Sequence, residues 1–468
     1  MIGYGSFISI FFRNLNRTKE LRSTHSFFLG LIIVTLLAFC TYFLNYDYPP
    51  GLFWDETFYI PSAEKYIHHI PFTHDQPPLG QMIIALGEQI INANPNKDTL
   101  WLTELNSVQQ DLPLDFSFRG YRLVPCFLAV ATAPILYLIL LSLINTVGLG
   151  FLFTFFYIFD NAMIVHFRGS MLDGSLMFFI LLSILNFISL YKSDRQGNSI
   201  TWGDLTLGVL LGCCLMIKLT GCFMMVSLII LLVKKKNILG FIASCSTFIA
   251  IFLVVWAIHF FWTHNLSVDF IEKIIKNYQF MLKFHQDITP LDLCRKGENG
   301  SYPIYWIIGG KTISYRWMSI DDNSYAYLYL VSNPIVWGLS LLGIIISNSF
   351  FLSSLLLDVP IKKLEWIKLI LGLWWSYMGG IFLIRRTLYL YHYFPGLMLG
   401  LILLYLCFGE MQFSAKDKNL LAMAIVCLVV ITFQFYSPLT YYQPITDSQL
   451  QRRAIIPAWD LECARCQD

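Results

Sequence analysis

Residues 26–59 read SFFLGLIIVTLLAFCTYFLNYDYPPGLFWDETFY, and this stretch decides the fold class. Its first part, about residues 26–45, is an apolar run of the ~20 residues that one membrane crossing needs. Basic residues precede the run, so the positive-inside rule places residues 1–25 in the cytoplasm. The chain then emerges on the outer side, where the adjacent carboxylates Asp55 and Glu56 stand among aromatic residues.

The composition of the whole chain agrees with a membrane protein. Of 468 residues, 56% are hydrophobic and only 13% are charged, against about 25% charged in an average soluble domain. A net charge of +2 argues against a nucleic-acid-binding surface, and 16% aromatic residues exclude intrinsic disorder. We therefore predict an all-α polytopic membrane protein.

Further apolar runs complete the predicted topology, for a total of about eleven transmembrane helices. Lysine and arginine clusters fall in alternate loops, which is the pattern of a consistently inserted bundle. Residues 204–233 are predicted to form two short helices that meet near Lys218, because one long helix would place the triple lysine 234–236 on the wrong side. The ten further runs are residues 122–143, 148–165, 172–191, 204–217, 219–233, 238–262, 326–348, 367–385, 388–407 and 419–436.

This topology divides the chain into a cytoplasmic N-terminus, a transmembrane domain over residues 26–436, and an extracytoplasmic tail over residues 437–468. Two outer loops, about residues 46–121 and 263–325, are long enough to carry function, and the first is expected to contain short helices. In the tail, Cys463 and Cys466 have C-x-x-C spacing, but no second pair completes a four-cysteine zinc site.

The acid pair and a nearby polar turn are the first candidates for chemistry. Asp55 and Glu56 are either a solvated acid pair or helix cap, or a buried pair of which one member acts as a base. His74 and Asp75 precede the rigid Pro77-Pro78 turn and are either ligands or, as we favour, simply exposed.

Cations near the outer ends of the predicted helices are the second group. Arg122, Lys218 and Arg386 either reach lipid phosphates at the interface or bind one particular phosphate in a site. Asp173 either pairs structurally with Arg168 or takes part in a substrate pocket, and His392 is either a hydrogen-bonded core histidine or a pocket residue.

The order of these motifs resembles the protein O-mannosyltransferase family, which are dolichyl- or polyprenyl-phosphate-mannose–protein mannosyltransferases of the GT-C type. No single motif is specific, but the colinear set covers almost the whole chain. The set comprises Asp55-Glu56, residues 77–80, Arg122-Leu123, residues 160–162, Leu172-Asp173, residues 212–221, 281–285 and 301–303, Asn333-Pro334, and residues 390–395 and 442–459. Residues 263–325 are too few for the β-trefoil domain of eukaryotic members, so the resemblance is to the prokaryotic form.

The resemblance implies a GT-C fold and transfer of mannose, with inversion, from a polyprenyl-phosphate donor to Ser or Thr hydroxyls of proteins at the outer membrane face. Asp55 is then the general base and Glu56 positions the acceptor or sugar, while the three cations bind the donor phosphate. The sugar pocket would draw on His74, Asp75, Asp173 and His392. No cofactor or metal is implied, and the expected location is the plasma membrane, or the endoplasmic reticulum membrane in a eukaryote. Gln76 and Leu219 depart from the family's usual His and Trp.

Two other functions stay open at this stage. A GT-C enzyme could transfer a different sugar to a lipid or polysaccharide, as lipid A aminoarabinose transferases do. A transporter would also place polar residues within a multi-span bundle, but it would place them near the bilayer midplane, and no inverted repeat is visible here.

Overall fold

The structure is a computed structural model that describes residues 21–461, except 96, 105–111, 113–114, 194–197, 296 and 358–359. Seven of the described helices are long and apolar enough to cross a membrane. They are α2 (Leu21–Ala38) with its continuation η1 (Phe39–Phe43), α5 (Arg119–Leu143), α8 (Leu172–Lys192), α11 (Ile238–Trp262), α14 (Pro334–Leu356), α16 (Phe394–Glu410) with the preceding η4 (Leu390–Tyr393), and α17 (Ala415–Thr440). An eighth crossing is a helix pair bent by 62°, α6 (Val147–Ile158) and α7 (Asn161–Phe167). The protein is thus a multi-pass integral membrane protein.

The remaining predicted crossings correspond to shorter or less apolar helices. They are α9 (Trp202–Ile217), η3 (Leu219–Met225) with α10 (Val226–Lys235), and α15 (Leu364–Phe382). The predicted break at Lys218 is confirmed, because α9 ends at Ile217 and Lys218 has an extended backbone. The total agrees roughly with the prediction of eleven.

The predicted helix over residues 326–348 is wrong in its first part. Residues 324–330, SYAYLYL, form the strand β2 (Ser324–Leu330), and α14 starts only at Pro334. Tyrosine at every second position favours a strand, and the side chain of Asn333 caps the helix that Pro334 opens.

The outer loops hold short helices and a small sheet. The first loop contains α3 (Glu56–Ile67), α4 (Leu79–Ile91) and η2 (Leu100–Glu104), as expected. The second contains α12 (Phe270–Asp287), α13 (Pro303–Trp306) and β1 (Ile313–Ser319), and the tail adds β3 (Pro444–Thr446), α18 (Asp447–Gln451) and η5 (Pro457–Trp459). The strands form an antiparallel sheet in the order β1-β2-β3, which the all-α prediction did not include. Cys463 and Cys466 lie outside the described residues.

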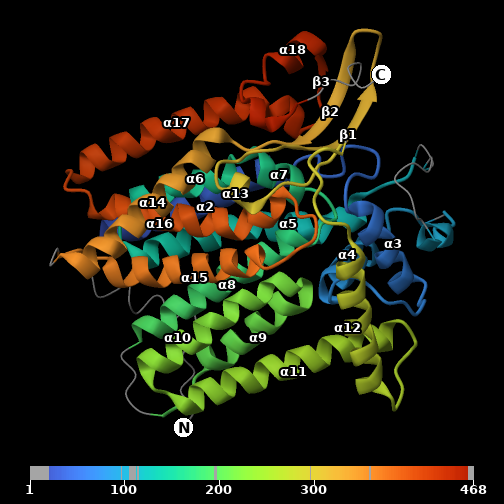
Figure 1. The fold of residues 1–468 in the computed structure, drawn as a ribbon, viewed down its shortest axis with the longest axis horizontal. Coiled ribbons are helices and arrows are strands. Elements are labelled where there is room, and N and C mark those ends of the chain that lie inside the picture. The colour runs from blue at the N-terminus through green and yellow to red at the C-terminus, as the bar shows by residue number, and fades with distance from the viewer. Residues whose placement is uncertain are drawn as a thin grey trace.

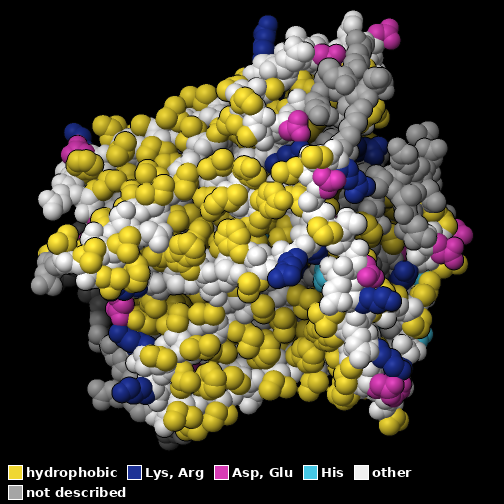
Figure 2. Space-filling view, viewed as in Figure 1, with side chains coloured by type: hydrophobic (Ala, Val, Ile, Leu, Met, Phe, Trp, Pro, Cys, Tyr) yellow, Lys and Arg dark blue, Asp and Glu magenta, His cyan; other side chains and the backbone are white. Residues whose placement is uncertain are grey.

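The helices pack as a bundle with its outer loops gathered at one end (Figure 1). On the face shown in Figure 2, hydrophobic side chains form a broad band, and charged side chains gather at both ends of it. The segment Leu390–Glu410 is buried over all of residues 390–408. It approaches α14 closely, because a Cβ atom at Gly343 would lie 2.5 Å from the carbonyl oxygen of Gly400, the small-residue contact typical of membrane helices.

Candidate active site

Asp55 lies at the first turn of the outer loop, as the N-cap residue of α3. Its Oδ2 atom accepts a hydrogen bond of 3.2 Å from the hydroxyl of Tyr391. Burial raises the pKa of Asp55 to about 7, although the nearby ammonium of Lys218 acts in the opposite direction. A carboxyl group with that pKa can exchange a proton near neutral pH, as a general base must.

Glu56, in contrast, is fully buried in an ion pair with Arg122. Two hydrogen bonds of 2.7 and 2.8 Å join the guanidinium to the two carboxylate oxygens. The carboxylate also accepts from the backbone N–H groups of Phe53 and Ser170. Glu56 therefore fixes the loop that carries Asp55.

The geometry corrects the prediction that Arg122 binds the donor phosphate. Its guanidinium is fully buried, and all five of its N–H donors are engaged by Glu56 and by backbone carbonyl groups. The carbonyls belong to Asp47, Pro49 and Gly51, at 2.8 to 2.9 Å. No donor is left for a phosphate, so Arg122 holds the loop after the first span in shape. It also leaves Glu56 with no free oxygen for a sugar.

Lys218 and Asp173 form a second buried ion pair, close to Tyr391. The ammonium of Lys218 lies 2.8 and 3.1 Å from the two oxygens of Asp173 and 5.1 Å from the centre of the Tyr391 ring. His166 completes the group through Nε2, at 3.0 Å from Asp173. Of the two alternatives for Asp173, the pair with Arg168 does not form, because Arg168 donates instead to the carbonyls of Thr41, Leu44 and Asn45.

Aromatic residues connect these groups into one wall around Asp55. Tyr391 stacks on His166 at 4.5 Å, and Nδ1 of His166 lies 2.6 Å from the hydroxyl of Tyr315 in β1. Tyr315 in turn stacks on Trp54 at 5.1 Å. His166, Tyr315 and Tyr391 are not among the site residues predicted from the sequence. Only His166 could have been noticed from the sequence, as a polar residue at the end of the short helix α7. Nothing in the sequence indicates that β1, which carries Tyr315, lies beside α3.

A cavity of about 630 Å³ opens next to this wall, a size typical of small-molecule sites. Three predicted site residues, Lys218, Arg386 and His392, line it. Further lining residues are Gln76, Leu219, Thr220, Leu282, His285, Gln286, Ile288, Pro290, Leu383, Ile384 and Arg385. The two departures from the family pattern, Gln76 and Leu219, are thus both cavity residues.

Three of the predicted pocket residues, His74, Asp75 and His392, lie outside the two ion pairs described above. His74 and Asp75 are not exposed as expected. Their side chains contact each other at 2.5 Å and are only 13% and 21% accessible. Burial acts to raise the pKa of Asp75, but His74 and His285 together bring it below its usual value. Nδ1 of His392 lies 3.0 Å from the carbonyl of Tyr389, so His392 is both a hydrogen-bonded buried histidine and a cavity residue.

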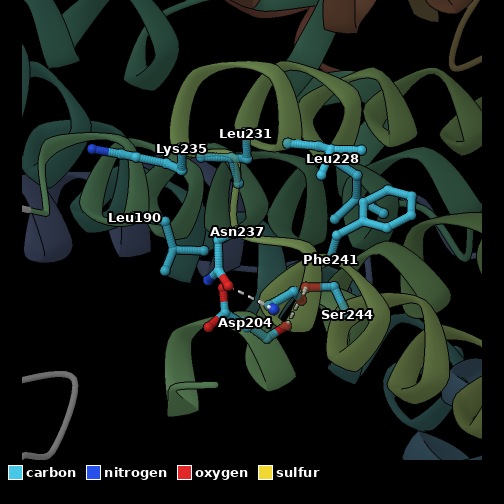
Figure 3. A pocket seen from close by; sticks show the side chains of 10 residues that line it. Leu190, Asp204, Leu228, Leu231, Lys235, Asn237, Phe241 and Ser244 are labelled. Carbon is cyan, nitrogen blue, oxygen red and sulfur yellow. Dashed lines mark hydrogen bonds between the residues drawn. The ribbon is translucent and has the colours of Figure 1, made fainter. Parts of the chain in front are cut away.

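A second cavity lies at the opposite end of α11, among Asp204, Lys235, Asn237 and Ser244 (Figure 3). Its volume of about 30 Å³ is that of one water molecule. This cavity is too small for a sugar, and it lies at the α10–α11 turn, far along the bundle from Asp55. Among the residues that the structure describes, no group of three or more His, Cys, Asp or Glu is placed to hold a metal ion.

Two protein families match this chain, and together the matches cover residues 32–459. Residues 32–282 match the family described as dolichyl-phosphate-mannose-protein mannosyltransferase. Residues 270–459 match the C-terminal four-transmembrane region of protein O-mannosyltransferases.

Curated relatives are similar over part of their length. Protein O-mannosyl-transferase 1 of Mus musculus is 28% identical over 199 residues, which is 42% of this chain and 26% of the relative. Dolichyl-phosphate-mannose–protein mannosyltransferase 4 of Candida albicans is 25% identical over 201 residues, with the same coverage of 42% and 26%. The matched part of the chain thus spans about a quarter of these relatives.

Two solved structures share the fold. The Saccharomyces cerevisiae protein O-mannosyltransferase Pmt1-Pmt2 complex, bound to the sugar donor, superposes with a TM-score of 0.79 at 13% identity, covering 95% of this chain and 94% of that chain. The Archaeoglobus fulgidus oligosaccharyltransferase has a TM-score of 0.52 at 11% identity, covering 93% and 60%. The fold is therefore the GT-C fold. Because the first family match alone spans more than half of the sequence, this chain belongs to the dolichyl-phosphate-mannose-protein mannosyltransferase family.

Proposed function

We propose that this protein transfers a mannosyl group from a polyprenyl- or dolichyl-phosphate-linked donor to Ser or Thr hydroxyls of acceptor proteins. The observation that carries the proposal is the position of Asp55. It is a carboxylate with a pKa of about 7, held just after the first span by a fixed loop and hydrogen-bonded to Tyr391. The ring of Tyr391 lies 5.1 Å from Lys218, one of the cations that line the cavity. The family to which the chain belongs supports the choice of sugar and acceptor.

In the proposed reaction, the carboxylate of Asp55 removes the proton of the acceptor hydroxyl as its oxygen attacks the anomeric carbon. The bond from that carbon to the lipid phosphate breaks on the opposite side, which inverts the configuration. Positive charge develops on the sugar and negative charge on the leaving phosphate. The Tyr391 hydroxyl bonds to Asp55 and orients it toward the acceptor.

Lys218 and Arg386 are the proposed ligands of the donor phosphate. Both line the cavity, and both can offer N–H groups to phosphate oxygens as the glycosidic bond breaks. Lys218 is held in place by Asp173, which keeps one ammonium beside the reacting centre without closing the cavity. Arg122 is not proposed as a phosphate ligand, because all five of its N–H donors are already engaged.

We place the active site on the outer side of the membrane. The lysines at positions 234–236 and 362–363 lie at the opposite ends of the spans from Asp55, and basic residues mark the cytoplasmic side. In a eukaryote the same orientation would put the site in the lumen of the endoplasmic reticulum.

The direct test uses purified protein in lipid nanodiscs, polyprenyl-phosphate-mannose and a Ser/Thr-rich peptide. Mass spectrometry should find the peptide heavier by one hexose. A matched peptide with every Ser and Thr replaced by Ala should stay unmodified. A hexose found on lipid rather than peptide would instead favour the lipid-glycosylating GT-C alternative.

The rate should depend on pH in the way that the Asp55 carboxyl dictates. Since burial raises its pKa to about 7, the base is protonated and inactive below that pH. We expect kcat/KM to fall about tenfold for each pH unit below 7 and to level off above it. Initial rates between pH 5 and 8.5 measure this profile, and a flat profile through pH 7 would contradict the assignment.

Replacing Arg386 should weaken donor use specifically. Arg386 is partly exposed at the cavity, so Arg386→Gln removes a charge without creating a buried vacancy. A hydrogen bond to a charged partner is worth about 1.5–3 kcal/mol, which predicts a rise in donor KM of about tenfold or more. Acceptor KM should stay within twofold. Separate titrations of donor and peptide check this, with Arg119→Gln, at an exposed site, as the control.

A further inference from the structure

His166 is a fully buried histidine whose two ring nitrogens both have polar partners. Nε2 lies 3.0 Å from Oδ2 of Asp173, and Nδ1 lies 2.6 Å from the hydroxyl oxygen of Tyr315. The carboxylate of Asp173 can only accept, so Nε2 carries the ring proton and Nδ1 accepts from the tyrosine. Asp173 already has the ammonium of Lys218 as its counter-ion, and a neutral imidazole completes the group without a second buried positive charge.

The Nε2 side of His166 leads to a proposed phosphate ligand. The two oxygens of Asp173 lie 2.8 and 3.1 Å from the ammonium of Lys218, which lines the cavity. Because His166 donates to the same carboxylate from another helix, Asp173 is held from two directions and cannot turn together with the lysine. The place of the Lys218 ammonium in the cavity therefore depends on His166.

The Nδ1 side of His166 leads to the proposed base. The ring of Tyr315, which donates to Nδ1, stacks at 5.1 Å on Trp54, the residue before Asp55. The face of the His166 ring also stacks at 4.5 Å on Tyr391, whose hydroxyl donates to Asp55. His166 thus contacts both aromatic residues through which the wall reaches Asp55.

The short helix that carries His166 is itself firmly held. Asp160 caps the helix with its side chain and also accepts a hydrogen bond of 2.9 Å from the indole of Trp337 in α14. Asn161 donates at 2.7 Å to the hydroxyl of Thr440 in α17. A side chain on such a support keeps its partners in a precise arrangement.

We propose that His166 is a positioning residue that fixes the phosphate cation and the general base relative to each other, with one ring nitrogen acting on each. Nε2 orients Asp173 and through it Lys218, and Nδ1 orients Tyr315 and through it the wall beside Asp55. His166 is fully buried and is not a lining residue of the cavity, so it acts on substrates through these partners. The assignment rests on the proposed roles of Lys218 and Asp55.

Two substitutions at one position separate the two nitrogens. In His166→Asn the amide oxygen reaches the place of Nδ1 and can still accept from Tyr315. In His166→Gln the amide nitrogen reaches the place of Nε2 and can still donate to Asp173. Both variants lose the ring that stacks on Tyr391, so a difference between them reports the hydrogen bonds alone.

Binding of farnesyl phosphate, which has a phosphate but no sugar, tests the Nε2 side without turnover. It is titrated by calorimetry into each purified full-length variant in nanodiscs. We expect Kd to rise about tenfold in His166→Asn, because a hydrogen bond to a charged group is lost, and to stay within twofold in His166→Gln. If His166→Asn does not fold, His166→Phe and Tyr315→Phe supply the same comparison, since only the first of them loses the bond to Asp173.

Mannosyl transfer should show the opposite order in kcat. His166→Gln leaves the Tyr315 hydroxyl without its acceptor, so kcat should fall about tenfold while the donor KM stays within twofold. His166→Asn should instead raise the donor KM and lower kcat less. Tyr315→Phe removes the same bond from its other end and keeps the ring on Trp54. It should reproduce the kcat of His166→Gln, and adding it to that variant should cause no further loss.

His259 provides the matched control. It is a buried histidine in α11 whose Nδ1 lies 2.7 Å from the hydroxyl of Tyr66 in α3, and it does not line the cavity. His259→Asn and His259→Gln should leave farnesyl phosphate binding and kcat within twofold, even where they lower the thermal unfolding temperature.

Equal changes in Kd for the two His166 variants, or no change in either, would overturn the proposal and leave His166 as a packing residue. Failure of the unchanged protein to bind farnesyl phosphate would remove Lys218 as a phosphate ligand, and with it this role of His166. Binding that differs between the two variants, in a protein that mannosylates no peptide, would support the role of His166 and count against the proposed function alone.

Discussion

Asp55→Asn is expected to reduce mannosyl transfer by about 10²–10⁴-fold, the range that a positioned general base contributes. The amide has nearly the same shape as the carboxylate and can still accept the hydrogen bond of Tyr391, so the fold should persist. It cannot take the proton of a serine hydroxyl, however. The measurement is kcat with saturating donor and peptide, together with the thermal unfolding temperature of the purified variant.

Asp47→Asn is the matched control for this substitution. Asp47 lies in the same loop and pairs at the surface with Arg119, at 2.8 Å, away from the cavity. Its substitution should leave kcat within about threefold, since exposed ion pairs contribute little. Full turnover by the Asp55→Asn variant would eliminate Asp55 as the base.

Arg122→Ala should act on stability, with a large effect. The change leaves the Glu56 carboxylate buried without its cation and leaves three backbone carbonyls without their donor. Breaking a buried ion pair in this way costs about 3–5 kcal/mol. We expect a marked fall in the thermal unfolding temperature and in the yield of monodisperse protein.

The double variant Arg122→Met with Glu56→Gln separates this role from phosphate binding. Removing both charges takes away the uncompensated carboxylate, so part of the lost stability should return. If Arg122 instead bound the donor, Arg122→Ala would unfold at the temperature of the unchanged protein and show only a raised donor KM. That outcome would restore the prediction made from the sequence.

The difference between Arg122 and Lys218 shows what a sequence can indicate about charge. Both are cations at the outer ends of helices, and the same reasoning proposed both as phosphate ligands. In the structure, the two residues differ in their hydrogen-bond partners. The carbonyl groups of Asp47, Pro49 and Gly51 accept hydrogen bonds from Arg122. Lys218 has one carboxylate partner and still faces the cavity. Backbone carbonyls carry no sequence signature, so this distinction could not be predicted.

The strand β2 and the aromatic wall around Asp55 could not be predicted for a similar reason. The apolar run that begins at residue 326 has the length and hydropathy of a crossing, and only the alternating tyrosines distinguish β2. Tyr315 reaches His166 across 149 positions of the chain, and Tyr391 reaches Asp55 across 336. Contacts at such separations depend on how the helices pack, which local pattern does not encode.

By itself, the sequence determined the membrane bundle, the break at Lys218, the two long outer loops and the acid pair after the first span. These features follow from runs of apolar residues and from the placement of charge, because transfer from water to lipid acts on each segment almost independently. Only the tertiary structure decided which carboxylate of the Asp55-Glu56 pair can act as a base. Glu56 is paired with an arginine whose donors are all occupied, whereas Asp55, hydrogen-bonded to Tyr391, is left as the carboxylate able to take a proton.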